Sequence, residues 1–308
     1  MDREWIRRHQ LMVFFILAYA ITWSVQIPAY LFAYREDLRL SNEANTEHFL
    51  DLLPGEGAPG LTPYLLLFMF TFGPSVAGVI VTALVGGRAG LAELWSRVAR
   101  VRVGPRWIVI VVLLPVALAV TALALAFAVG GFQTFGFDLL VPLSLFLPLF
   151  IYMLVCTALA EEIGWRGYAL PELQRHHTAE RASWILGFGW GLWHIPSVLV
   201  GPLLQGDLHV GLVIPVLLAL TFGVVGWTIV ITWIYNNTQS VFWIIVLHGW
   251  NNTVQSYLVL SAEQYAAQVI FPILPWAIAI WLLKKYGAET LTGRRNEGAQ
   301  ATVAGHAA

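Results

Sequence analysis

Charged residues interrupt an otherwise apolar stretch at Glu161-Glu162, with Arg166 following shortly after. On a helix Glu162 and Arg166 lie four residues apart on one face, where they can form an ion pair. Glu161 is rotated about 100° from Glu162 on that helix, and it has no partner nearby in the sequence. An unpaired carboxylate in apolar surroundings is a candidate general base. The same residues could instead mark the edge of a membrane-spanning helix, and the sequence alone leaves both interpretations open.

Two histidines supply further candidates. His194 lies within an apolar run, and Pro196 predicts a helix kink just after it. His248 and Asn252 lie four residues apart on one face of a later run, and Gly249 between them would allow a backbone or a substrate to approach closely. Each group could simply join helices by hydrogen bonds. Together, a carboxylate, two histidines and an amide supply a base, a second water ligand and two oxyanion donors, which is the set that peptide hydrolysis needs.

The composition identifies the kind of element that holds these residues. Hydrophobic residues make up 58% of the 308 residues and charged residues 11%, against about 25% charged in a typical soluble chain. A soluble domain of this size could not cover its surface with so few charges. The net charge of −1, with scattered basic residues, excludes an electrostatic nucleic-acid binder. The single cysteine, Cys156, excludes an internal disulfide, and its apolar surroundings argue against a reactive thiolate.

We therefore expect an all-α, polytopic membrane helical bundle, because runs of about 20 apolar residues cross the bilayer as helices. About eight transmembrane helices are predicted, at residues 10–34, 62–86, 107–131, 137–160, 182–204, 211–235, 240–261 and 264–283. With both termini cytoplasmic, all of the 17 lysines and arginines except Arg35 and Arg39 lie on the cytoplasmic side. Counting residues along these predicted helices places Glu161 near the cytoplasmic end of its helix. The same count places His194 and His248 deeper in the membrane.

The domain organisation follows from the same pattern. Residues 1–286 are predicted to form a single transmembrane domain, with the motifs in a core at about 140–260. Residues 287–308 are polar and rich in Gly, Ala and Thr, which predicts a disordered cytoplasmic tail. Residues 1–136 contribute spans but no motif, so their role stays open.

The three motifs together resemble the CAAX protease and bacteriocin-processing (CPBP) family of intramembrane endopeptidases, which includes the Ras-converting prenyl-protein endopeptidases. The family pattern is Glu-Glu-x-x-x-Arg, then Phe-x-x-x-His, then His-x-x-x-Asn or Asp. In this sequence the pattern falls on Glu161, Glu162 and Arg166, on Trp190 and His194, and on His248 and Asn252. Trp190 stands where the family usually has Phe.

The resemblance implies a hydrolase that cuts a peptide bond of a membrane-associated or lipid-anchored protein or peptide. It implies that Glu161 activates the water and that His194 helps to hold it. His248 and Asn252 would stabilise the oxyanion. Glu162, positioned by Arg166, would hold these catalytic side chains in place.

Family members have been described both as metalloproteases and as metal-independent glutamate proteases. The sequence has no His-Glu-x-x-His helix, although Glu161, His194 and His248 could still bind Zn²⁺. Asn252 is a poor zinc ligand and a good oxyanion donor. This favours the glutamate-type mechanism without a cofactor.

Two other functions use the same residues. The buried polar groups could form the path of a proton- or ion-coupled transporter, or the chain could be a non-catalytic immunity or accessory protein. The expected partners are a peptide or protein substrate and the lipid bilayer, with no nucleic acid. Two lysines against fifteen arginines indicate a GC-rich bacterial genome, and hence a multi-pass protein of the bacterial cell membrane. Such a source favours a membrane-tethered peptide or a bacteriocin leader as the substrate over a prenylated protein, but the sequence does not identify the substrate. The sequence does not indicate an oligomeric state.

Overall fold

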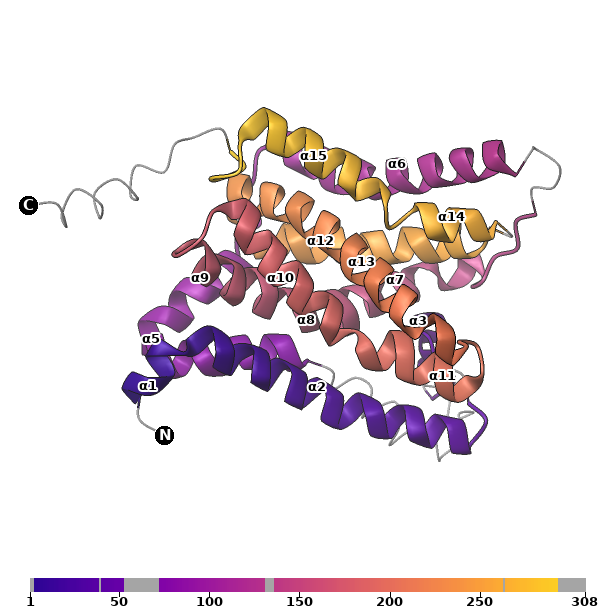
Figure 1. Cartoon of the computed structure of the whole chain (residues 1–308), viewed down its shortest axis with the longest axis horizontal. Coiled ribbons are helices and arrows are strands. Elements are labelled where there is room, and N and C mark those ends of the chain that lie inside the picture. Colours follow the sequence, from indigo (N-terminus) through magenta and orange to yellow (C-terminus); the bar gives the residue numbers. More distant parts are fainter. Residues whose placement is uncertain (1–2, 39, 53–71, 131–135, 263, 293–308) are drawn as a thin grey trace, which may run out of the picture.

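Helices lying side by side along one long direction make up the fold (Figure 1). The computed structural model describes residues 3–38, 40–52, 72–130, 136–262 and 264–292. Within these ranges there is no β-strand, and the one isolated bridge joins Phe137 to Ala262. The predicted all-α fold is confirmed.

The helices follow one another along the chain with short breaks between them. The α-helices are α1 (Arg3–Arg8), α2 (Gln10–Arg35), α3 (Asn42–Leu52), α5 (Gly73–Val98), α6 (Pro105–Val129), α7 (Phe146–Tyr152), α8 (Ala160–Gly164), α9 (Leu170–Gln174), α10 (Ala179–Trp193), α11 (Gly201–Gln205), α12 (Val213–Thr238), α13 (Val241–Val254), α14 (Tyr265–Ile270) and α15 (Leu274–Tyr286). Short 3₁₀ turns are η1 (Leu143–Leu145) and η5 (Val210–Leu212). Wider π-helical turns are η2 (Met153–Leu159), η3 (Trp165–Ala169), η4 (Pro196–Val200) and η6 (Gln255–Leu260).

Several of these helices are long and apolar enough to cross a membrane. Six such segments occur in the described part of the chain: Gln10–Arg35, Gly73–Val98, Pro105–Val129, Leu143–Gln174, Val210–Thr238 and Tyr265–Tyr286. The bent pair Ala179–Trp193 and Pro196–Gln205 makes a seventh if it is one span. The segment formed by α13 and η6, which carries His248 and Asn252, is not among them. The count of eight and the cytoplasmic termini stay predictions, and residues 62–71 of the second predicted run lie outside the described ranges. The start of α1 and the end of α15 lie at the same end of the bundle (Figure 1), as an even number of crossings requires.

The helix that carries the two glutamates differs from its prediction. Its expected range was 137–160, but the helical segment runs from Leu143 to Gln174. Glu161 therefore lies near its middle and not at its inner edge. The buried carboxylate of Glu162 is paired with Arg166 inside this helix, so the charged residues did not mark its end.

The N-terminal half braces this motif helix. Helix α5 packs against α8, and a Cβ on Gly164 would lie 2.1 Å from the carbonyl oxygen of Pro74. Only glycine fits at this crossing. The Ser75 hydroxyl also donates to the carbonyl of Leu159 at 2.8 Å. Residues without a motif of their own thus fix the helix that carries Glu161.

The chain after α15 packs against two other helices. The amides of Ala179 and Glu180, which begin α10, donate to the carbonyls of Glu289 and Ala288 at 2.8 and 3.0 Å. Leu291 is fully buried. The prediction of a disordered tail from residue 287 does not hold for residues 287–291, because their backbone carbonyls cap a helix and Leu291 joins the core. Residues 293–308 lie outside the described ranges.

Candidate active site

Glu162 is the centre of a buried polar network. Arg166 donates through Nη1 to both carboxylate oxygens of Glu162, at 2.8 and 3.0 Å, and both side chains are fully buried. The ion pair predicted from their spacing is confirmed. Glu162 Oε1 also accepts from Nδ1 of His248 at 2.8 Å. This second contact joins residues 86 positions apart, and nothing in the sequence indicated it.

Glu161 is buried and has a partner that the sequence did not predict. Trp190 on α10 donates from Nε1 to Glu161 Oε2 at 2.5 Å. Among the described residues no donor reaches the other carboxylate oxygen, Oε1. Glu161 takes no part in the Glu162–Arg166 ion pair, although it interacts electrostatically with Arg166. The sequence prediction missed the contact with Trp190, whose indole N–H is a donor that phenylalanine lacks.

His194 lies where its helix breaks. Helix α10 ends at Trp193, and the helix that resumes at Pro196 is bent by 43° relative to it, as Pro196 predicted. The His194 amide bonds to the Gly191 carbonyl at 3.2 Å, and the His194 Nδ1 bonds to the Trp190 carbonyl at 2.8 Å. A carbonyl only accepts, so Nδ1 carries the proton. Nε2 of the neutral ring is then an acceptor, and no donor among the described residues bonds to it.

His248 and Asn252 both lie on α13. His248 is buried, and its ring meets that of Trp190 edge-on with centroids 5.5 Å apart. Asn252 is half-buried and donates from Nδ2 to the Thr157 hydroxyl at 3.3 Å. A Cβ on Gly249 would lie 3.1 Å from the backbone nitrogen and Cα of Leu154. The close approach predicted at Gly249 is therefore made by the backbone of η2.

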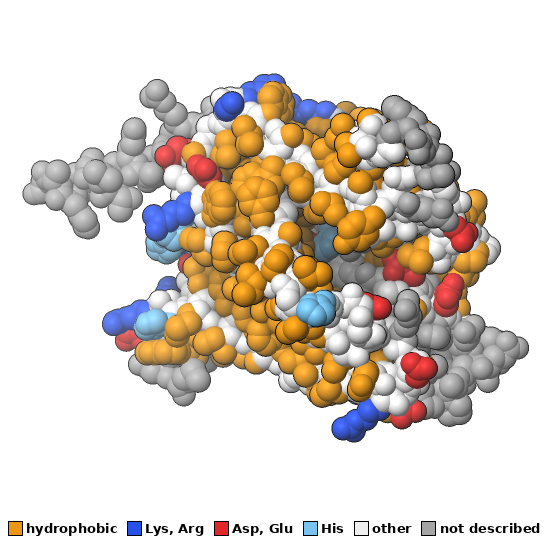
Figure 2. Space-filling view, turned by 45° about the vertical axis from the view of Figure 1, so that its right-hand side comes forward, with side chains coloured by type: hydrophobic (Ala, Val, Ile, Leu, Met, Phe, Trp, Pro, Cys, Tyr) orange, Lys and Arg blue, Asp and Glu red, His pale blue; other side chains and the backbone are white. Residues whose placement is uncertain are grey.

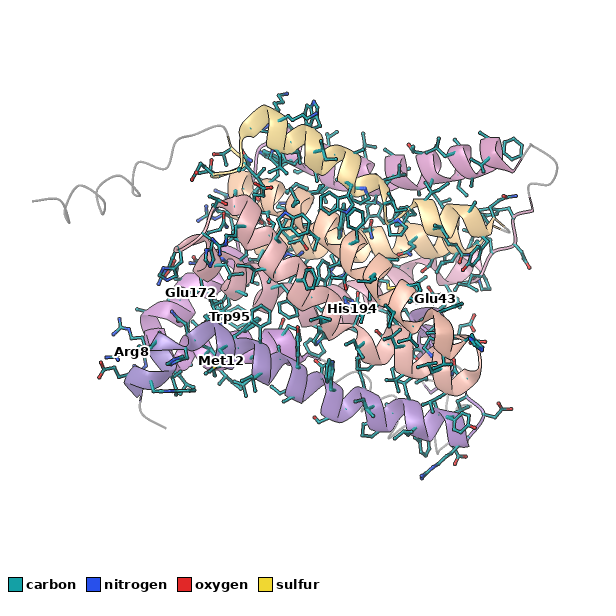
Figure 3. The ribbon with its side chains drawn as sticks, viewed as in Figure 1. Arg8, Met12, Glu43, Trp95, Glu172 and His194 are labelled. Atoms are coloured by element: carbon teal, nitrogen blue, oxygen red, sulfur yellow. The ribbon has the colours of Figure 1, made fainter. Side chains whose placement is uncertain are left out.

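The structure brings all six predicted site residues into one region. Glu161 interacts electrostatically with Arg166, His194 and His248, although these residues come from three separate helical segments. Figure 3 shows His194 midway along the bundle, between the end that carries Arg8 and Glu172 and the end near Glu43. Figure 2 shows a hollow on a largely hydrophobic face, with a histidine side chain inside it.

The sequence named Glu161, His194 and His248 as an alternative set of metal ligands. Across the part of the chain that the structure describes, no three His, Cys, Asp or Glu side chains are arranged to hold a metal ion. That set is therefore not such a group, and the choice between a metal-dependent and a metal-independent mechanism stays a prediction. We therefore derive no step through a metal.

Comparison with known proteins finds a match to this part of the chain. Residues 142–254 match the family described as type II CAAX prenyl endopeptidase Rce1-like. This segment is Rce1-like. The matched range contains all six site residues, and it confirms the resemblance that the motifs indicated. The Rce1-like segment and the apolar helices together indicate an integral, multi-pass membrane protein.

A curated relative agrees with this match. CAAX prenyl protease 2 of Methanococcus maripaludis is 31% identical to the chain over 121 residues. These residues are 38% of this chain and 43% of the relative. The chain thus matches less than half of the relative's length.

Proposed function

We propose that this protein is an intramembrane endopeptidase that hydrolyses a peptide bond of a membrane-associated or lipid-anchored protein or peptide. One observation carries the proposal. The buried carboxylate of Glu161 lies with two histidines whose Nδ1 atoms are both engaged, His194 on a carbonyl and His248 on Glu162. The Rce1-like segment and the protease name of the archaeal relative support it.

The first step is activation of water by Glu161. Its Oε1 accepts one proton of the water while its Oε2 stays bonded to Trp190. The second hydrogen of the water is accepted by Nε2 of His194, because the Nδ1–H of that ring is bonded to Trp190 O. With both hydrogens held, the oxygen lone pair is directed at the substrate carbonyl carbon. General-base assistance of this kind contributes about 10²- to 10⁴-fold.

The second step needs donors for the tetrahedral oxyanion. Nδ1 of His248 already donates to Glu162, so Nε2 can donate only when the ring is an imidazolium. Glu162 and Glu161 balance the charges of that ring and of Arg166, so the site is close to neutral before the reaction. Asn252 supplies the second donor from the N–H of Nδ2 that Thr157 does not take. A single oxyanion donor is worth about 10²- to 10³-fold.

The third step returns the proton. When the peptide C–N bond breaks, Glu161 gives the proton taken from water to the leaving nitrogen. The immediate products are a carboxylic acid and an amine, and proton transfer between them gives a carboxylate and an ammonium group. Glu161 is ionised again. We place the protein in the bacterial cell membrane, because the arginine-rich, lysine-poor composition indicates a GC-rich bacterial genome. For the same reason we name a membrane-tethered peptide as the substrate class.

The test compares native membranes that contain the wild-type protein or Glu161→Gln. New protein termini near membrane anchors are expected with the wild type and are expected to be absent with Glu161→Gln. Glu36→Gln, a change at an exposed glutamate, is the matched control and should behave as wild type. Conduction or uptake in liposomes by the wild type, without new termini in the membranes, would replace the protease with a transporter.

A further inference from the structure

We propose that Trp190 is a positioning residue, whose indole N–H holds the Glu161 carboxylate so that Oε1 faces the water. The kinetic meaning of this inference rests on the proposed protease function. The contact itself rests on geometry. Trp190 Nε1 lies 2.5 Å from Glu161 Oε2, and both residues are buried, with 3% and 5% of their surfaces exposed.

The indole N–H of Trp190 donates to a single acceptor, the Glu161 carboxylate. Indole carries a single N–H and no acceptor, and a buried donor without a partner costs about 1–3 kcal/mol. Glu161 satisfies this donor, and the donor in turn occupies one of the two carboxylate oxygens. Phenylalanine, the usual residue of the family pattern at this place, could not make the contact. The hydrogen bond is thus a feature of this chain.

The direction of the N–H is fixed by the other contacts of Trp190. The Arg166 guanidinium carbon lies over the indole ring, 4.2 Å from its centroid. The His248 ring packs edge-on at 5.5 Å, and the His194 ring lies 5.7 Å from the indole ring, measured between centroids. A side chain with two rotatable bonds and these neighbours has little freedom. It therefore acts as a rigid donor that sets the rotation of the Glu161 carboxylate.

Trp190 thus contacts Glu161, Arg166 and both histidines. The hydrogen bond from Trp190 occupies Oε2 of the Glu161 carboxylate. It also leaves Oε1 as the oxygen available for the water. Loss of the donor should leave substrate binding intact and make the carboxylate less well oriented.

The experiment removes the N–H and keeps the ring. Benzothienylalanine at position 190 has sulfur in place of the indole N–H and nearly the same shape, so the contacts to Arg166 and His248 remain. We expect kcat to fall by about 10- to 100-fold, the cost of a misplaced catalytic group, with KM close to that of the wild type. Trp190→Phe should lose at least as much. Trp184→Phe, on the same helix but on an exposed ring, should keep wild-type kcat.

A second measurement does not depend on activity. In a ¹H–¹⁵N spectrum of the indole groups, the resonance missing from Trp190→Phe belongs to Trp190. We expect it among the most downfield, and we expect it to move upfield in Glu161→Gln. An unmoved resonance, or unchanged kcat with benzothienylalanine, overturns the positioning role. If the wild type cleaves nothing while the resonance moves as expected, the contact stands and the protease function fails.

Discussion

Arg166→Ala tests the buried network around Glu162. The change removes both hydrogen bonds from Arg166 to a carboxylate that is fully buried, and the contact of the guanidinium with Trp190 is lost as well. Breaking a buried ion pair by removing one partner costs about 3–5 kcal/mol. The cation–π contact adds about 0.5–2 kcal/mol. We therefore expect folded Arg166→Ala protein in detergent to be less stable by at least ~3 kcal/mol.

The double variant separates charge from structure. In Arg166→Ala with Glu162→Gln the buried carboxylate that lost its arginine is gone, and the glutamine oxygen can still accept from His248. Most of the lost stability should return. Turnover should stay low, because the imidazolium of His248 has lost the carboxylate that balances its charge.

The measurement is the thermal unfolding of the purified variants, monitored by size-exclusion chromatography. Arg175→Ala is the matched control, because its pair with Glu172 leaves the Arg175 side chain 66% exposed. Such a pair contributes about 0–1 kcal/mol. If the double variant is no more stable than Arg166→Ala, or if Arg175→Ala is equally damaging, then the Glu162–Arg166 pair is not what holds the network.

Three further predictions concern the fold. Gly164→Ala should destabilise the protein by about 1–3 kcal/mol, as overpacking does, because the new Cβ would clash with Pro74. Gly86→Ala, with open space around it, should leave stability unchanged. Equal melting temperatures for the two variants would contradict the close packing of α5 against α8 at Gly164. Truncation after Tyr286 should lower stability by about 2–4 kcal/mol, because the hydrogen bonds that cap α10 and the burial of Leu291 are lost. Truncation after Thr292 keeps those contacts and is the control. Identical unfolding curves for the two truncations would show that the caps contribute nothing. Reporter fusions after Ala99 should read inside and fusions after Asp207 outside, and a reversed pattern would overturn the predicted orientation.

Local features of the site could be predicted from the sequence because they depend on nearby residues. The Glu162–Arg166 pair follows from helical spacing, and the bend after His194 follows from Pro196. The bonds from His248 to Glu162 and from Trp190 to Glu161 could not be predicted, since they depend on how separate helices pack. The presence of tryptophan, a donor, was the one available signal for the second bond.

The limits of the elements were harder to predict for a related reason. Charged residues suggested an end near residue 160, yet the helix continues to Gln174 because its buried charges neutralise each other. The polar composition after residue 286 suggested disorder, yet backbone carbonyls there cap α10. Amino-acid composition predicts neither the ion pairs within a buried helix nor the hydrogen bonds that the backbone makes.

The central claim is that Glu161 activates water without a metal. The most direct test measures turnover of a membrane-anchored substrate by exhaustively chelated wild-type protein, beside Glu161→Gln prepared in the same way. We predict full turnover for the chelated wild type and a loss of about 10²- to 10⁴-fold or more for Glu161→Gln, with folding unchanged. Wild-type activity that disappears on chelation and returns with added Zn²⁺, or full turnover by Glu161→Gln, would contradict the claim.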